Sequence, residues 1–376
     1  MSINLAESRV IIDNTFSDNA GTPLTLLSSR AGCAAKIGPK ELQELLGTLE
    51  IKDSDARFNL SSNEDANCVD IGNGLLLAQS VDVITPVSDD PIILGSIATV
   101  HALSDLYAKG ANPLTGLITF GVPLFQVSIN TAGQILQGAI NKLEEAGAKL
   151  LGGHTFASKE LFIGLSVTGM MNKTRPVSNS GCRAGDALIL TKPLGSGIIV
   201  TAQKLVNAGI PVNGFTEALK TSCENVMLEL NNTASICMLK AGVNACTDIT
   251  GFGLIGHLQE MLIASQVSAT LVMADIPIIS GAIELANQDI LSVGSERNLV
   301  HWKKTCEFAV NISYAEKMVL FDPQTSGGLL MSVDHSKAEY LLEELRKAEI
   351  KDCAIIGYVT PLVDNTVVRV QKQVRN

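Results

Sequence analysis

The sequence predicts an α+β fold in which two domains follow a mobile N-terminal arm. The chain has 376 residues, and about 100–200 residues per domain suggests two domains, or three. Strand-like apolar runs and helix-like periods occur on both sides of a polar segment at 172–181, whose Pro and Gly are typical of a linker. We therefore expect the arm at 1–58, one domain at 59–172 and a second at 182–370.

The composition excludes several classes of protein. Lys and Arg number 28 against 38 Asp and Glu, so the net charge is −10 and no basic face for nucleic acid is expected. The chain has no run of about 18 apolar residues that would predict a membrane span, and no signal peptide pattern at its start. The eight cysteines form no CxxC pair and most lie in apolar runs, which is typical of free thiols in the cytoplasm.

The arm contains a candidate nucleophile. Its one amphipathic run, Pro39 to Leu49, predicts a short helix. Before this run lies Cys33, with Arg30 and Lys36 three residues to either side. Nearby cations lower the pKa of a thiol and so enrich the nucleophilic thiolate. The alternative is an incidental exposed thiol.

In the first domain, Asn73-Gly74 predicts a two-residue hairpin turn, because both residues of a type I′ turn need positive φ. With that register, Asp65 and Asp82 lie opposite each other at the open end of the hairpin. Like charges directly opposite are unfavourable, so a bound divalent cation or a shared proton would be needed between them. The alternative is two solvated carboxylates at strand ends.

The next element is a helix with an N-cap at Asp90, a proline at 91 in its first turn and Gly110 after its end. Asp105 lies in its last turns, where the helix dipole disfavours a carboxylate. A basic side chain or a metal ion is therefore expected beside Asp105. The other elements expected are a helix at about 131–146, strands at 148–152, 161–170 and 186–190, and a last helix near 335–348.

Three glycine-containing turns indicate a site for phosphate. Asp248 ends a strand, and the turn at 249–253 leads into a helix whose free amides can bind an anion. Gly195-Ser196-Gly197 repeats this arrangement, and Gly152-Gly153-His154-Thr155 follows a strand. No segment matches GxxxxGK[ST] or GxGxxG, so the pattern favours phosphate bound through Mg²⁺ on carboxylates rather than a P-loop.

The histidines do not indicate a metal site. The five of them are scattered, without the spacing of zinc ligands and without an accompanying cysteine, so no zinc is expected. His101 and His257 lie in apolar helix-like segments. We interpret both as residues that pack helices.

These motifs, in this order, resemble those of the selenophosphate synthetase (selenide, water dikinase) family, within the aminoimidazole-ribonucleotide-synthetase-like superfamily of ATP-binding proteins. The similarity extends over about residues 28–330. Gly32-Cys33 with Lys36, Ile37 and Pro39 points to the selenium branch. The other matching segments are Glu64-Asp65-Ala66, Ser104-Asp105-Leu106, Gly152-Gly153-His154-Thr155, and the segments at 190–195, 247–254 and 322–329.

The resemblance implies a two-domain aminoimidazole-ribonucleotide-synthetase-like architecture with the mobile arm. It implies an enzyme that converts ATP, selenide and water to selenophosphate, AMP and phosphate. It also implies a homodimer in which the N-terminal domains pair through their sheets, with each active site near the interface.

Roles for individual residues follow from the same resemblance. Lys36 would contact the phosphates, Cys33 would carry or position selenium, and Asp82 and Asp105 would bind the nucleotide. Three carboxylates would hold Mg²⁺: Asp65, Asp105 and Asp248. The nucleotide site would be completed by Ser62, Asn63, Glu64, Gly153, His154 and Thr155.

The arm departs from the family pattern His-Gly-x-Gly-Cys-Gly-Cys-Lys. Positions 29, 30, 34 and 35 are Ser29, Arg30, Ala34 and Ala35, so we expect a stiffer arm with no second thiol beside Cys33. One alternative function is another ATP-dependent enzyme of the superfamily, similar to a thiamine-phosphate kinase or a purine-biosynthetic ligase, which would not need Cys33. The other is a non-catalytic ATP-binding paralogue.

Overall fold

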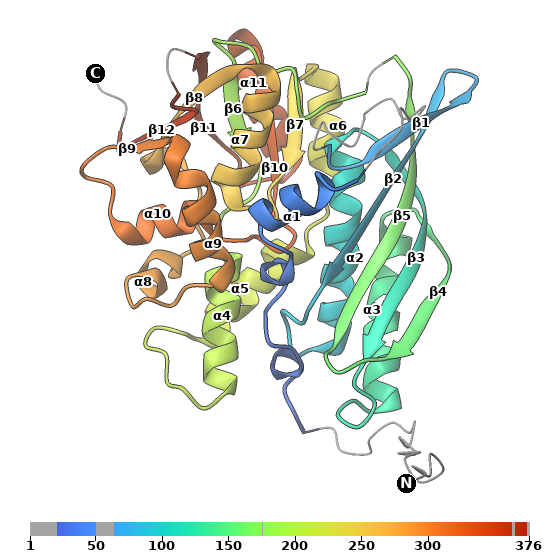
Figure 1. The fold of residues 1–376 in the computed structure, drawn as a ribbon. Coiled ribbons are helices and arrows are strands. Elements are labelled where there is room, and N and C mark those ends of the chain that lie inside the picture. Colours follow the sequence, from blue (N-terminus) through green and yellow to red (C-terminus); the bar gives the residue numbers. More distant parts are fainter. Residues whose placement is uncertain (1–20, 50–63, 175, 363–364, 374–376) are drawn as a thin grey trace, which may run out of the picture.

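The computed structural model describes residues 21–49, 64–174, 176–362 and 365–373. They form two domains that each combine a sheet with helices, and the described part of the arm runs between them (Figure 1). The predicted two-domain α+β fold is confirmed. Ser62 and Asn63, together with part of the predicted arm, lie outside the described residues.

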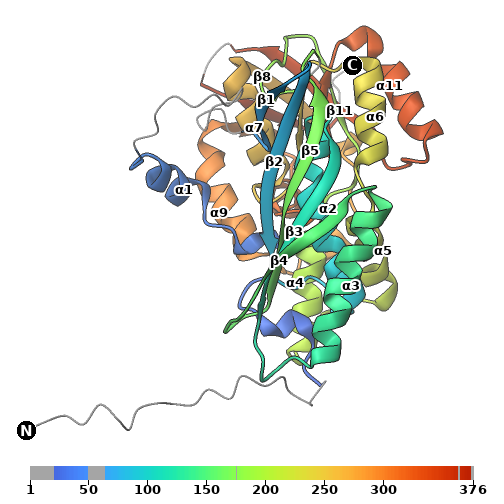
Figure 2. The same ribbon diagram turned by 90° about the vertical axis from the view of Figure 1, so that its right-hand side faces the viewer.

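The first domain is a five-stranded sheet in the order β1-β2-β5-β3-β4. Two helices cover one face of this sheet, and the view in Figure 2 looks onto the other face, which no described element covers. The elements are β1 (Asn67–Gly72), β2 (Leu75–Ile84), α2 (Pro91–Ala108), β3 (Asn112–Val122), α3 (Ile129–Glu145), β4 (Lys149–Ala157) and β5 (Phe162–Asn172).

The central helix α2 begins and ends where its capping residues predict. The Asp90 side chain accepts a hydrogen bond from the Ile93 N–H, and Gly110 takes a positive φ of 74° after the last turn. α2 has 18 residues and is apolar enough to cross a membrane, but 83% of it is buried inside the protein, as in a core helix. It packs on the sheet and contacts the second domain through β7 (Ala245–Asp248).

The hairpin turn is confirmed, but the predicted pairing of Asp65 with Asp82 is wrong. Asn73 and Gly74 have φ values of 54° and 75°, as the turn requires. A one-residue bulge between Asp70 and Gly72 then shifts the register, so that Asn67 pairs with Gln79 and β1 begins after Asp65. Asp82 instead pairs with Leu165 of β5.

The strand predicted at 148–152 extends to Ala157, so residues 152–155 are not a turn after a strand. They lie within β4, which pairs in parallel with β3 and forms an edge of the sheet. The strand predicted at 161–170 is β5, shifted by one or two residues.

The second domain is built on a seven-stranded sheet in the order β7-β10-β6-β11-β8-β12-β9. The predicted strand at 186–190 and last helix at 335–348 are confirmed as β6 and α11. The strands other than β7 are β6 (Ala187–Leu190), β8 (Val267–Val272), β9 (Cys306–Phe308), β10 (Leu329–Val333), β11 (Ala354–Pro361) and β12 (Val368–Gln371). The helices are α4 (Ser196–Asn207), α5 (Glu217–Leu228), α6 (Asn232–Ala241), α7 (Gly253–Ser265), α8 (Ala282–Ala286), α9 (Val293–Trp302), α10 (Tyr314–Phe321) and α11 (His335–Lys347).

The described part of the arm, 21–49, packs against both domains. It contains two short 3₁₀ turns (Leu24–Leu27 and Cys33–Ala35) and the expected helix α1 (Pro39–Leu46). Gly32 bridges to Thr85 at the end of β2, and its φ of 52° together with its contact with Thr325 leaves no room for a side chain. This fixes the position of Cys33, which is 1% exposed.

Candidate functional site

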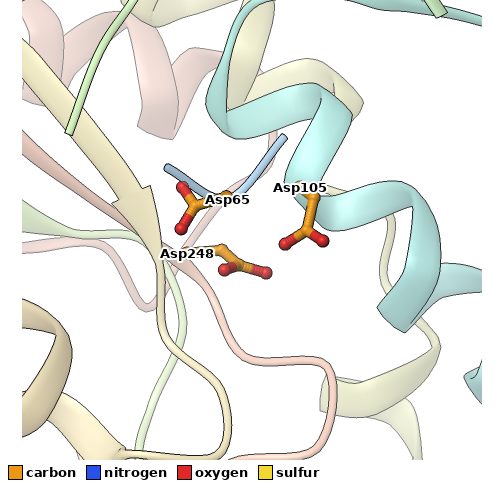
Figure 3. Close-up of side chains that lie close together, drawn as sticks. All are labelled: Asp65, Asp105 and Asp248. Atoms are coloured by element: carbon orange, nitrogen blue, oxygen red, sulfur yellow. The ribbon is translucent and has the colours of Figure 1, made fainter. Parts of the chain in front are cut away.

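Three aspartates converge where the two domains meet (Figure 3). Asp65 lies just before β1, Asp105 in the last turn of α2, and Asp248 at the end of β7. One carboxylate oxygen of each lies within 4.8 Å of the others. The structure therefore brings together the three residues that the resemblance assigns to Mg²⁺.

The electrostatics of this cluster show an excess of negative charge, which Lys109 and Lys36 offset only in part. Burial, together with the like charges of Asp82 and Asp248, raises the pKa of Asp105 well above its usual value. Burial and the charge of Asp65 raise the pKa of Asp248 to about 7. The cluster therefore needs protons or a cation to be stable at neutral pH.

The donor set fits a magnesium ion. Mg²⁺ prefers carboxylate oxygens, and three carboxylates meet here. Among the described residues, Asp65 Oδ2 and Asp248 Oδ2 are buried and accept no hydrogen bond, and of the two only Asp65 Oδ2 has a recorded ion pair, with Lys109 Nζ at 3.3 Å. Oxygens left in this state are costly unless a cation binds them.

A buried lysine that the sequence reasoning missed lies at the edge of the cluster. Lys109 Nζ is 2.5 Å from Glu64 Oε2 and 3.3 Å from Asp65 Oδ2, and it also contacts the Asn179 side chain. Glu64 additionally accepts from the Ser178 hydroxyl and, at 3.0 Å, from the Asn179 N–H. The Glu64 carboxylate is thus held by donors from this chain and joins the start of β1 to the segment that connects the domains.

The arm brings Cys33 and Lys36 to the same interdomain region. Lys36 Nζ lies 2.7 Å from Asp82 Oδ1, and Asp82 lies on β2 with its side chain 9% exposed. Burial alone would raise the pKa of Asp82, but Lys36 and His101 hold it below its usual value. Lys36 and Asp82, with Phe162 and neighbours on β2, line a pocket of 440 Å³.

The interpretation of His101 as only a packing residue is wrong. Its Nε2 lies 3.2 Å from Cys33 Sγ and 3.4 Å from Asp82 Oδ2, and its Nδ1 accepts from the Ser326 N–H at 3.3 Å. Cys33 is therefore buried against an imidazole, and the alternative of an incidental exposed thiol is also wrong. His101 and Asp105 of α2 and Lys109 at its C-cap follow one another at a spacing of four residues, which was a signal available in the sequence.

The glycine-containing turns that were expected to bind phosphate contribute less to the site than the sequence predicted. The first amides of α4, at Gly195 and Ser196, donate to Gln324 Oε1 at 2.9 and 3.1 Å, so they are already occupied. His154 lies on β4, level with Thr119 of β3, and three strands of the sheet separate β4 from β1. Gly153, His154 and Thr155 are therefore not brought to the aspartates within one chain.

Comparison with known families and proteins agrees with this geometry. The N-terminal domain of AIR synthase related proteins matches residues 63–171, and their C-terminal domain matches 183–369. A selenide, water dikinase of Caldanaerobacter subterraneus is 42% identical over 340 residues, covering 89% of this chain and 95% of the relative. One of Clostridioides difficile is 38% identical over 341 residues, covering 90% and 95%.

Solved structures share the fold. Thiamine-monophosphate kinase from Stenotrophomonas maltophilia has a TM-score of 0.62 at 18% identity, covering 89% of this chain and 95% of that one. The hydrogenase maturation protein HypE in complex with ATP has a TM-score of 0.56 at 18% identity, covering 91% and 90%. The structural likeness supports the architecture, and the sequence identity decides the family. The chain belongs to the selenide, water dikinase family, within the AIR synthase related proteins.

Proposed function

We propose that this protein synthesises selenophosphate from ATP, selenide and water, and releases AMP and phosphate. The observation that carries this proposal is that the Cys33–Lys36 segment lies against Asp82, beside the three-aspartate cluster. A sulfur and a lysine ammonium group thus lie at one carboxylate site.

The carboxylates supply the metal site of this proposed reaction. Asp65, Asp105 and Asp248 would hold Mg²⁺, which neutralises the phosphate oxygens and the charge that develops during phosphoryl transfer. Asp82 would adjoin the nucleotide. Lys109, whose Nζ lies 3.3 Å from Asp65 Oδ2, would help to hold the Asp65 side chain in place.

The arm supplies the remaining groups. Lys36 would bind phosphate oxygens, and its side chain is 34% exposed, so it can exchange its ion pair with Asp82 for a ligand. Cys33 would bind or position selenium. Because the Gly32–Cys33 backbone packs under Thr325, closure of the arm also restricts water at the site, as a reaction through reactive phosphoryl intermediates requires.

The products formed from ATP test the proposal. The protein is incubated anaerobically with ATP and Mg²⁺, with and without selenide, and the nucleotides are separated by chromatography. Selenide-dependent AMP supports the proposal, and Asp105→Ala should abolish it. ADP formed without selenide would instead indicate a kinase of the thiamine-phosphate type, and bound ATP with no turnover would indicate a non-catalytic paralogue.

We also propose that the protein is a homodimer formed through the open face of the first sheet (Figure 2). Large apolar side chains are exposed on this face, among them Val81 at 62% and Leu117 at 48%. Exposed contiguous apolar surface marks interaction sites. The others on this face are Val69, Val83 and Phe156.

A dimer of this kind would explain where the predicted nucleotide residues lie. His154 stacks near Phe156 on the open face, with 5.7 Å between ring centroids, and Phe156 packs near Phe162 of the Lys36 pocket at 5.4 Å. A second copy on this face would therefore lie beside the pocket. We further propose a cytoplasmic location, since all eight cysteines are free thiols and seven of them are buried.

A further inference from the structure

One arginine of the second domain binds the backbone of the Cys33–Lys36 segment. Arg297 lies on α9, 261 residues after Lys36 in the sequence. Its Nη1 donates to the Lys36 carbonyl at 3.2 Å, and its Nη2 donates to the Ala34 carbonyl at 2.7 Å. Arg297 forms no ion pair with any described carboxylate, although the charge of Glu41 on α1 acts on it. Its guanidinium is therefore directed at two carbonyls of the arm.

Both carbonyls lie at the end of one turn. Cys33–Ala35 form a 3₁₀ turn, which the Lys36 N–H closes by donating to the Cys33 carbonyl at 3.1 Å. Carbonyls at the end of a helical turn have no partner within it, and Arg297 supplies one for two of them. A planar guanidinium offers N–H groups from two nitrogens in a fixed geometry, which a lysine ammonium does not. Arg297 can thus fix the orientation of the turn as well as its position.

Two glycines let the segment approach the second domain closely. A Cβ on Gly294, at the start of α9, would lie 3.3 Å from the Cβ of Ala34. The methyl group of Ala34, one of the departures from the family pattern, therefore packs directly on α9. A Cβ on Gly251 would lie 3.0 Å from Lys36 Cδ. The surface around Arg297 is thus shaped to the backbone of this segment.

These contacts also set the direction of the Lys36 side chain. Arg297 holds the Lys36 carbonyl, and the Lys36 stem passes Gly251. The Lys36 Nζ then lies 2.7 Å from Asp82 Oδ1 on β2. Because Asp82 belongs to the first domain and the other two residues belong to the second, Lys36 spans the interdomain site.

We propose that Arg297 is a positioning residue that holds the Cys33–Lys36 segment beside the carboxylates. It acts through the Ala34 and Lys36 carbonyls and does not itself touch the reacting atoms. This deepens the proposed function, on which only the consequence for turnover rests: Cys33 and Lys36 are in place for as long as the segment is held.

The size of the effect follows from the two hydrogen bonds. Hydrogen bonds that involve a charged group contribute about twice as much as neutral ones. Their loss should raise the fraction of molecules in which the segment has moved away by about 10–100-fold. The contacts of the segment with the first domain remain, so the rest of the fold is expected to persist.

The first experiment needs no variant. The N–H groups of Cys33, Ala34, Ala35 and Lys36 all donate hydrogen bonds, so they exchange slowly with deuterium if the segment is held. Exchange is measured by mass spectrometry on peptic peptides of the wild-type protein without substrates. Exchange of these four groups at the rate of an unstructured peptide would overturn the proposal.

The second experiment measures how often the segment opens. Cys33 is 1% exposed, so iodoacetamide reaches its sulfur only when the segment moves away. Alkylation is followed at one pH on the tryptic peptide 31–36, whose only cysteine is Cys33. The internal reference is Cys182, which is 4% exposed and is the only cysteine of the tryptic peptide 174–183. Its rate reports opening of the protein away from the arm.

The variants change the two donors. Arg297→Met removes both and should raise the ratio of the Cys33 rate to the Cys182 rate by about 10–100-fold. Arg297→Lys keeps the charge without the planar fork, so its ratio should lie between those of Arg297→Met and wild type. The matched control is Arg183→Met, which changes an exposed arginine of the second domain and should leave the ratio unchanged. A ratio within threefold of wild type in Arg297→Met would overturn the proposal. If that variant does not fold, a wild-type ratio in Arg297→Lys would overturn it as well.

Turnover is measured separately, as selenide-dependent AMP formation. Arg297→Met should lower it at least tenfold, and Arg297→Lys should lower it less. Exchange and alkylation are measured without substrates, so a wild-type protein that forms no AMP removes the proposed function and leaves the role of Arg297 readable. Wild-type turnover in Arg297→Met together with an unchanged alkylation ratio removes the role of Arg297 alone.

Discussion

Replacing Asp248 by asparagine should make the metal-free protein more stable at neutral pH and insensitive to Mg²⁺. Asp248 is 1% exposed, and burial with the charge of Asp65 raises its pKa from 3.8 to about 7. That shift of roughly 3 pH units corresponds to about 4 kcal/mol of unfavourable interaction in the charged form.

The sign of the pH dependence follows from the raised pKa. Between pH 3.8 and about 7 the folded Asp248 binds a proton that the unfolded chain has lost. The stabilisation that comes from this proton on the folded Asp248 is therefore complete below pH 3.8, and it is lost as the pH rises to about 7. Bound Mg²⁺ replaces the proton and should restore stability at pH 8, by about 2.7 kcal/mol at a hundredfold excess over its dissociation constant.

Urea unfolding at pH 5.5 and pH 8, with and without Mg²⁺, measures both effects. Asp322 and Glu260 also have raised pKa values, of about 7 and 8. The quantity compared is therefore the difference in the free energy of unfolding between the wild type and the variant under each condition. Asp275→Asn, at an exposed position outside the cluster, is the matched control. An Asp248→Asn protein that keeps the wild-type pH slope and the wild-type response to Mg²⁺ would refute the reasoning.

Three further predictions concern Lys36 of the arm, the buried ion pair of Lys109, and the open face of the first sheet. Lys36→Met removes the partner of Asp82 and a phosphate contact, so turnover should fall by about 10²–10³-fold in the AMP assay, and a rate within threefold of wild type would contradict this. Lys109→Met leaves Glu64 buried without its cation and should lower the free energy of unfolding by about 3–5 kcal/mol; unchanged urea unfolding would argue against that ion pair. Val81→Asp should produce monomers in sedimentation equilibrium, whereas Val310→Asp, at a fully exposed position of the second domain, should not.

Local chemistry explains what the sequence predicted correctly. The N-cap at Asp90, the turn at Asn73-Gly74 and the glycine after α2 each depend on a few neighbouring residues, so their elements could be placed without tertiary information. The register of the hairpin could not be predicted in this way. The Asp70 side chain accepts the Gly72 N–H at 2.9 Å and Gly72 takes a positive φ, and this bulge changes which residues face each other farther along β1.

The site was predicted in part for a similar reason. The motifs containing Asp65, Asp105 and Asp248 could be recognised one at a time, and the structure shows that they meet. His101 was misinterpreted because a histidine in an apolar helix most often packs, and its partners Cys33 and Ser326 come from distant segments. Only tertiary structure shows which face of α2 points toward the arm.

The central claim is that the protein forms a bond between phosphorus and selenium. The most direct test is ³¹P NMR of an anaerobic reaction with ATP, Mg²⁺ and selenide enriched in ⁷⁷Se. We predict a new phosphorus resonance split by ⁷⁷Se, which grows in a one-to-one ratio with AMP and is absent from the Cys33→Ser protein. Consumption of ATP with no ⁷⁷Se-split resonance in the wild-type reaction would contradict the account.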